Sequence, residues 1–77
     1  MIADIRRLLE QTPFVPFSVR TAGGREYPVP TSDHIWLPPG GRRVAISDDQ
    51  GLVVWLPSLM ISGLVHAGNG QEGAAGT

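Results

Sequence analysis

Cysteine is absent from this sequence of 77 residues, so a disulfide or a zinc site built on thiolates is excluded. Its two histidines, His34 and His66, are too few for a transition-metal site made of side chains alone, and we expect no metal and no cofactor. A domain of this size buries only about 60% of the surface that its unfolded chain exposes. Small domains compensate with disulfides, metals or oligomerisation, so oligomerisation is the remaining route.

Lysine is also absent, and the formal net charge is −1. The basic residues are all arginines: Arg6, Arg7, Arg20, Arg25, Arg42 and Arg43. This charge balance gives no strong electrostatic footprint for nucleic acid. No apolar run approaches the roughly 20 residues that span a bilayer, and the opening "MIADIRRLLEQ" is amphipathic and charged, unlike a secretory leader. We therefore expect a cytoplasmic protein with no membrane attachment.

The first residues have the spacing of a short amphipathic helix. Between residues 2 and 11, the apolar side chains of Ile2, Ile5, Leu8 and Leu9 fall on one helical face. Pro13 ends the helix, because the residue before a proline is pushed out of the α region. A helix of about ten residues does not persist alone, so it must pack on the rest of the domain.

The segment "PFVPFSVRTAGGREYPVP" predicts a β-hairpin. A three-residue loop, Ala22-Gly23-Gly24, pairs Val19 with Tyr27 and Phe17 with Val29, which places the apolar residues of both strands on one face. Gly24 can take the left-handed conformation that such a loop needs. The two prolines of the second strand, at positions 28 and 30, have no N–H and indicate a sheet edge.

A second hairpin is predicted from "HIWL", "PPGG" and "RRVAIS". A four-residue loop over 38–41 pairs Ile35 with Val44 on the core face and places Trp36 and Arg43 on the opposite face. "LVVWL" is then predicted as the fourth strand and "MISGLV" as the fifth. One mainly β domain over residues 1–67 follows: an N-terminal helix and a five-stranded antiparallel SH3-like or Sm-like barrel. Residues 68–77 are Gly-rich and predicted to be a disordered tail.

The motifs resemble those of a group of short, uncharacterised bacterial proteins. The residues are "LL…TPFVPFSVRTAGGREYPVP…DHIWLPPGGRRVAISDDQG" followed by an apolar strand, and the group shares the Pro-Phe-x-Pro-Phe start, a Gly-Arg turn and an Asp-Gly turn. The resemblance covers residues 5–65 of this chain and implies no known activity.

The order of a helix and five strands also resembles the Sm-like fold of the bacterial RNA chaperone. "LPSLMISGLV" stands where that family has an aromatic-Lys-His-Ala-Ile-Ser-containing turn, and Ile61 and Ser62 match it. The positions that contact RNA in that family are Ser58 and Leu59 here. The resemblance therefore implies the shape, and ring formation by pairing of the fourth strand with a neighbour's fifth, but not the RNA site.

The sequence offers no recognisable catalytic set. Asp33 and His34 are neighbours whose side chains point to opposite faces of a strand, and no nucleophile motif is present. Asp48 and Asp49 precede Gly51 as in a hairpin turn and lack the spacing of a calcium loop. We expect no catalytic residue, no metal ligand and no enzymatic activity.

Two surfaces remain as candidate interaction sites. Trp36, Arg42 and Arg43 form a candidate patch for nucleic acid or a protein partner, in which tryptophans stack on bases; alternatively, the Arg43 stem simply covers Trp36. The fourth strand is apolar at every position, and its candidate oligomer seam comprises Leu52, Val54, Trp55 and Leu56.

Two explanations for that apolar strand stay open. It is either a seam between copies of the chain or a central strand on which the helix packs, because an exposed apolar strand would otherwise be prone to aggregate. The predicted function is a non-catalytic interaction or assembly module that forms a homo-oligomer. The alternative is an RNA-binding Sm-like ring.

Overall fold

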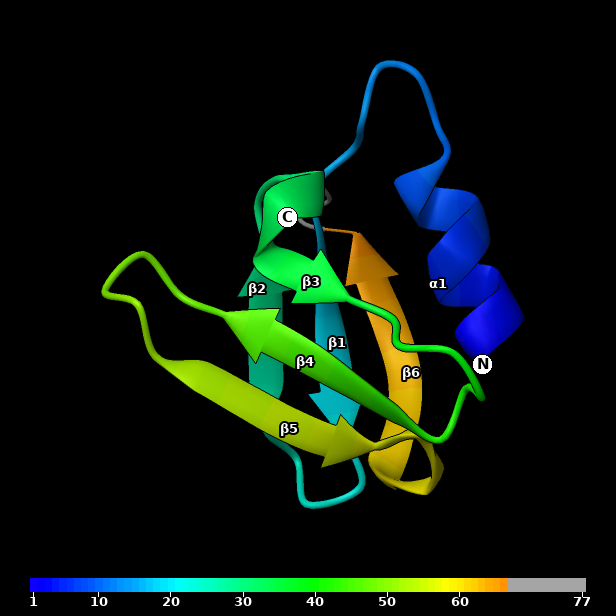
Figure 1. Ribbon diagram of the computed structural model, residues 1–77, viewed down its shortest axis with the longest axis vertical. Coiled ribbons are helices and arrows are strands. Elements are labelled where there is room, and N and C mark those ends of the chain that lie inside the picture. Colours follow the sequence, from blue (N-terminus) through cyan, green and yellow to red (C-terminus); the bar gives the residue numbers. More distant parts are fainter. Residues whose placement is uncertain (67–77) are drawn as a thin grey trace.

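The computed structural model describes residues 1–66 (Figure 1). The elements are helix α1 (Ile2–Leu9), strands β1 (Phe17–Thr21) and β2 (Glu26–Val29), 3₁₀ turn η1 (Ser32–His34), strands β3 (Ile35–Trp36), β4 (Arg43–Ser47) and β5 (Val53–Pro57), 3₁₀ turn η2 (Ser58–Met60) and strand β6 (Ile61–His66). The fold is thus mainly β with one N-terminal helix, as predicted. The predicted tail, residues 68–77, lies outside the described residues.

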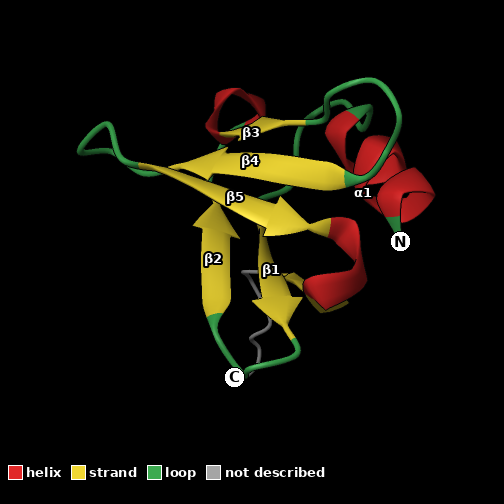
Figure 2. Ribbon diagram, turned by 60° about the horizontal axis from the view of Figure 1, so that its bottom comes forward, coloured by secondary structure: helices red, strands yellow, loops and turns green. Residues whose placement is uncertain are grey.

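Six strands form two antiparallel sheets, with the orders β2-β1-β6 and β3-β4-β5. Figure 2 shows β4 and β5 running across β1 and β2, so the two sheets pack face to face. The predicted count of five strands is one too few. The two hairpins contribute four strands, β1 to β4, and β5 and β6 follow them. Within residues 1–66 no strand pairing joins the two sheets, and the predicted closed barrel is not confirmed.

The register of the first hairpin is confirmed. Phe17 pairs with Val29 and Val19 with Tyr27, which places the apolar side chains of β1 and β2 on one face. Gly24 has a φ of 89°, the left-handed conformation predicted for the end of this loop. An L-residue with a Cβ is strained in that conformation, so glycine is the residue that the loop requires.

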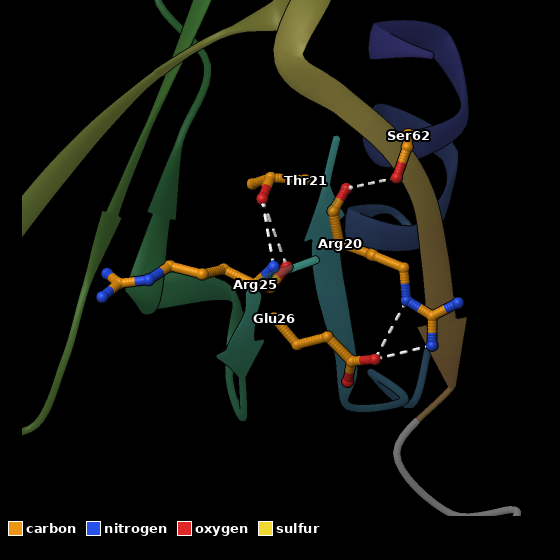
Figure 3. A network of polar contacts seen from close by, with 5 residues as sticks. All are labelled: Arg20, Thr21, Arg25, Glu26 and Ser62. Carbon is orange, nitrogen blue, oxygen red and sulfur yellow. Dashed lines mark hydrogen bonds and ion pairs between the residues drawn. The ribbon is translucent and has the colours of Figure 1, made fainter. Parts of the chain in front are cut away.

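Polar contacts fix the same hairpin (Figure 3). The Thr21 N–H donates to the Arg25 carbonyl at 2.8 Å, and the Arg25 N–H donates to the Thr21 hydroxyl at 3.3 Å. Across the two strands, Arg20 Nε and Nη2 donate to one carboxylate oxygen of Glu26 at 3.0 and 2.6 Å. On the other side of β1, the Ser62 hydroxyl donates to the Arg20 carbonyl at 3.3 Å and connects β6 to the hairpin.

The predicted register of the second hairpin is wrong by two residues. Ile35 pairs with Ile46 rather than with Val44, and Trp36 pairs with Ala45. The connection therefore runs from residue 37 to residue 42 and contains Gly40 and Gly41 at positive φ. Because the shift is an even number of residues, each side chain stays on its predicted face.

One apolar core lies between the sheets. The buried side chains from the two hairpins are those of Phe17, Val19, Val29, Ile35, Val44 and Ile46. Tyr27, predicted on the same face as Val29, is half-buried and packs against them. Leu56 of β5 and Ile61 of β6 complete the core from the second half of the chain. Burial of one such side chain contributes about 1.5–3 kcal/mol to the free energy of folding.

Helix α1 covers one end of this core. Ile5 is fully buried, while Ile2, Leu8 and Leu9 are partly buried against the core, as their spacing predicted. The helix ends at Leu9, two residues before the predicted end. It begins beside the β3–β4 loop (Figure 1), where the Ile2 side chain lies next to Gly41. In the part of the chain that the structure describes, no helix is long and apolar enough to cross a membrane.

Candidate interaction surface

The two faces of β5 have opposite environments. Leu56 points into the core and is 8% exposed, and Val54 is partly buried against the same core. Val53 and Trp55 point the other way and are 54% and 47% exposed. Since β5 is the last strand of its sheet and its outer face is exposed, the prediction of a central strand beneath the helix is wrong.

The four residues of the predicted seam are therefore divided between two environments. Leu52 and Trp55 are exposed and available for contact with another molecule, whereas Val54 and Leu56 belong to the interior. Val53 lies beside Trp55 on the outer face and was not among the predicted seam residues. The two-residue period of a strand indicates the outward orientation of Val53 once Leu56 is assigned to the core.

The backbone of β5 presents hydrogen-bonding groups at the sheet edge. The Asp48 N–H donates to the Leu52 carbonyl at 3.0 Å, and the Ser58 N–H donates to the Arg42 carbonyl at 2.9 Å. These bonds bracket a β4–β5 ladder without a register shift. Because hydrogen-bonded pairs alternate in an antiparallel ladder, the even-numbered residues of β5 bond to β4. The N–H groups of Val53 and Trp55 therefore point away from the sheet, as does the carbonyl of Pro57.

The corresponding edge of β2 lacks donors at two positions. The Thr21 N–H bonds to the Arg25 carbonyl, and the pairing continues in register to Val29. By the same alternation, the odd-numbered residues of β2 bond to β1 and the even-numbered residues point outward. Pro28 occupies an outward position, and Pro30 is the first residue after β2; neither has an N–H to donate.

An aromatic cluster lies on the outer face of the β3-β4-β5 sheet. The ring centroids of Trp36 and Trp55 are 5.8 Å apart with planes at 72°, an edge-to-face arrangement. Both tryptophans pair in register with Ala45 of the strand between them, and Ala45 is buried although it faces outward. The guanidinium carbon of Arg43 lies 4.9 Å from the centre of the Trp55 ring, a cation–π contact.

The predicted nucleic-acid or partner patch is thus brought together in part. Trp36 and Arg43 lie on one face, as predicted, but Arg43 stacks on Trp55 rather than covering Trp36. Arg42 contributes a backbone contact, since its carbonyl accepts hydrogen bonds from the Ser58 N–H and hydroxyl at 2.9 and 3.2 Å.

A cleft of about 270 Å³ opens between β2 and the β4–β5 hairpin, which extends beyond β2 in Figure 1. Its lining residues are Tyr27, Pro28, Pro30, His34, Ile46, Ser47, Asp48, Asp49, Leu52 and Val54. The lining is mainly apolar, and its formal negative charges belong to the two aspartates of the β4–β5 turn.

His34 connects this cleft to the β4–β5 turn. Its Nε2 lies 2.8 Å from Asp49 Oδ1, and its Nδ1 lies 2.9 Å from the Thr31 hydroxyl oxygen, both within hydrogen-bond distance. The Asp49 side chain is 86% exposed. His34 therefore pairs with Asp49, not with its neighbour Asp33, and the contact holds η1 against the turn.

The two aspartates of this turn have separate structural roles. Asp48 accepts the N–H groups of Gln50 and Leu52 at 2.9 and 3.0 Å, as expected for a turn. Among residues 1–66, no group of three or more His, Asp and Glu side chains is placed to hold a metal ion.

One arginine at the β1–β2 hairpin has a shifted pKa. Arg25 Nη1 donates to the Tyr27 hydroxyl at 3.5 Å. This hydrogen bond, together with the electrostatic interaction with the same hydroxyl, raises the pKa of Arg25 above its ordinary value. Because a guanidinium is protonated throughout the usual pH range, the shift adds no pH dependence.

Comparison of the chain with protein-family models, with curated proteins and with solved structures returns no match. The two resemblances described above therefore stay predictions.

Proposed function

We propose that this protein is a non-catalytic interaction or assembly module that self-associates through β5. The observation that supports this most directly is the combination of three properties in one strand. Val53–Pro57 contains no charged residue, exposes apolar side chains on its outer face, and directs two backbone N–H groups away from its sheet. Such an edge is a ready template for pairing with another strand.

The distribution of exposed apolar residues supports the same region. Large hydrophobic side chains that are exposed cluster between residues 52 and 60: Leu52, Val53, Trp55, Leu59 and Met60. Leu59 is 96% exposed. A concentration of exposed apolar side chains in one segment of a small domain is typical of an interaction site.

We also propose that the two sheets are the halves of an SH3-like or Sm-like small barrel in a cytoplasmic protein. Support comes from the order of the strands: η1 leads from β2 directly into β3, and η2 leads from β5 into β6. In the alternative assembly, an Sm-like ring, β5 of one copy would pair with β6 of the next.

The test of self-association compares two exposed valines. Val53 is 54% exposed on the outer face of β5, and Val15 is 41% exposed in the segment before β1. We expect light scattering to give a mass above that of one chain for the wild type and for Val15→Arg, but the mass of one chain for Val53→Arg. A wild type that stays monomeric at high micromolar concentration would show that β5 is not a seam.

RNA binding is the second candidate function, and the convergence of Trp36, Trp55 and Arg43 favours it. Exposed tryptophans can stack on bases while an arginine contacts the phosphate backbone. We expect short single-stranded RNA to bind weakly at low salt and Trp36→Ala to weaken that binding. Absence of binding at low salt would eliminate this candidate and leave self-association unaffected.

A further inference from the structure

The edges of the two sheets differ in how well they can receive another strand. An outward position of β2 is occupied by Pro28, and Pro30 follows directly after the strand; neither can donate. Strand β3 has only two residues. In β6, Ser62 is an extra residue: Arg20 pairs with Gly63 and Thr21 with Ile61, so the β1–β6 ladder contains a bulge. Prolines, short strands and bulges are the devices by which edges avoid pairing.

Strand β5 has none of these features before Pro57, and its pairing with β4 is regular over all five residues. We infer that β5 pairs antiparallel with β5 of a second copy of this chain, about a twofold axis at Val54. The inference rests on the proposed self-association and specifies its partner strand, direction and register.

The backbone groups of β5 are complementary to themselves in this register. Val53 of one copy lies opposite Trp55 of the other, and the N–H of each reaches the carbonyl of its partner. Two donors from each strand are satisfied in this way. Pro57 falls just beyond the bonded pairs, opposite Gly51 of the second copy, so its missing N–H ends the ladder without leaving a donor unpaired.

The side chains agree with the same register. On the outer face, each Val53 meets a Trp55, and aromatic and β-branched residues are a favourable cross-strand pair. The strand has no charge, so no like charges meet at the axis. The two Trp36–Trp55 pairs would then lie on one continuous sheet with the strand order β3-β4-β5-β5-β4-β3. Two five-residue edges form a small interface, below about 1,200 Å², so we expect a reversible dimer.

Disulfide trapping tests the register, because the wild-type chain contains no cysteine. In the inferred dimer the two Val54 residues face each other in a non-hydrogen-bonded pair with Cα atoms about 4.5 Å apart, within the range that a disulfide spans. We expect Val54→Cys to form a cross-linked dimer almost completely under mild oxidation. The control Val15→Cys should cross-link only at the background rate.

A second cross-linking experiment uses the exposed residues Val53 and Trp55, because Val54 is partly buried. In an equimolar mixture of Val53→Cys and Trp55→Cys chains, the mixed dimer should cross-link far more than either variant alone. A wild-type mass above two chains, or self-association without either cross-link, would overturn the twofold β5 pairing and leave the proposed function standing. A monomeric wild type would overturn both.

Discussion

Strands β2 and β5 are both outer strands of three-stranded sheets, yet their free edges are opposite in character. Both contain or adjoin prolines, and the difference lies in where the prolines fall. In β2, Pro28 occupies an outward position and Pro30 follows directly after the strand, so the edge lacks donors that another strand would need. In β5, Pro57 occupies only the last outward position, and Val53 and Trp55 keep their donors.

This difference shows that the number of prolines in a strand does not by itself determine whether its free edge can pair with another strand. What matters is whether each proline replaces an N–H that points to the neighbouring strand or one that points outward, and this alternates with every residue. The chain blocks one edge and leaves one open. The self-association proposed above would therefore be directed to β5 rather than distributed over the whole surface.

The largest expected effect on stability comes from a proline introduced into β5 at position 54, in contrast to one introduced at position 53. Val54→Pro removes an N–H that bonds to β4 and a side chain that packs on the core, and leaves a carbonyl of β4 unpaired. We expect a loss of at least about 2 kcal/mol in the free energy of unfolding. Val53→Pro removes only an outward N–H and should change that free energy by less than about 1 kcal/mol.

Thermal unfolding followed by circular dichroism distinguishes these two variants. Equal destabilisation by both substitutions would mean that the alternation assigned to β5 is incorrect, whatever the oligomeric state of the protein.

Opening the blocked edge is the converse experiment. The double substitution Pro28→Thr and Pro30→Thr restores two outward N–H groups on β2 while keeping residues that are common in strands. We expect a higher average mass by light scattering, or visible aggregation, at concentrations where the wild type stays in solution. An unchanged mass would mean that the prolines are not what protects this edge.

The aromatic cluster should contribute an intermediate effect. Trp36→Ala removes the edge-to-face contact with Trp55 and uncovers Ala45, and pairs of this kind contribute about 0.5–1.5 kcal/mol beyond the area they bury. We expect the midpoint of urea unfolding to fall accordingly. Trp36→Phe should recover part of the loss; no difference between Ala and Phe at this position would mean that the ring contact contributes nothing.

The smallest effect is expected on the outer side of the other sheet. The Arg20–Glu26 ion pair is exposed, so Arg20→Ala should lower the free energy of unfolding by only about 0.2–1 kcal/mol. The loss should shrink further at high salt, since screening weakens exposed pairs. A loss that does not depend on salt would point to packing of the arginine stem instead.

The first hairpin could be predicted from sequence because two independent signals agreed. The Gly23-Gly24 pair limited the loop length, and only one of the possible registers placed Phe17 and Val19 on the same face as Val29. In the second hairpin, loops of four and six residues both keep Ile35 on the core face. The hydrophobic pattern could not choose between them, and the shorter loop was wrong.

The candidate surface was harder to predict for a related reason. Residues 52–56 are apolar at every position, so the sequence lacks the alternation that assigns inner and outer faces. Val54 and Leu56 were therefore placed in a seam although they contact the core, and Val53 was omitted. Whether β5 lies at an edge, and which of its N–H groups point outward, depends on pairing with β4 and has no local signal.

Sedimentation equilibrium of the wild type and of Val53→Pro, from low to high micromolar concentration, tests the open β5 edge most directly. We expect the wild-type mass to rise from one chain toward two with concentration, while folded Val53→Pro keeps the mass of one chain throughout. A wild type that remains at the mass of one chain, or a Val53→Pro variant that associates as the wild type does, would contradict this expectation.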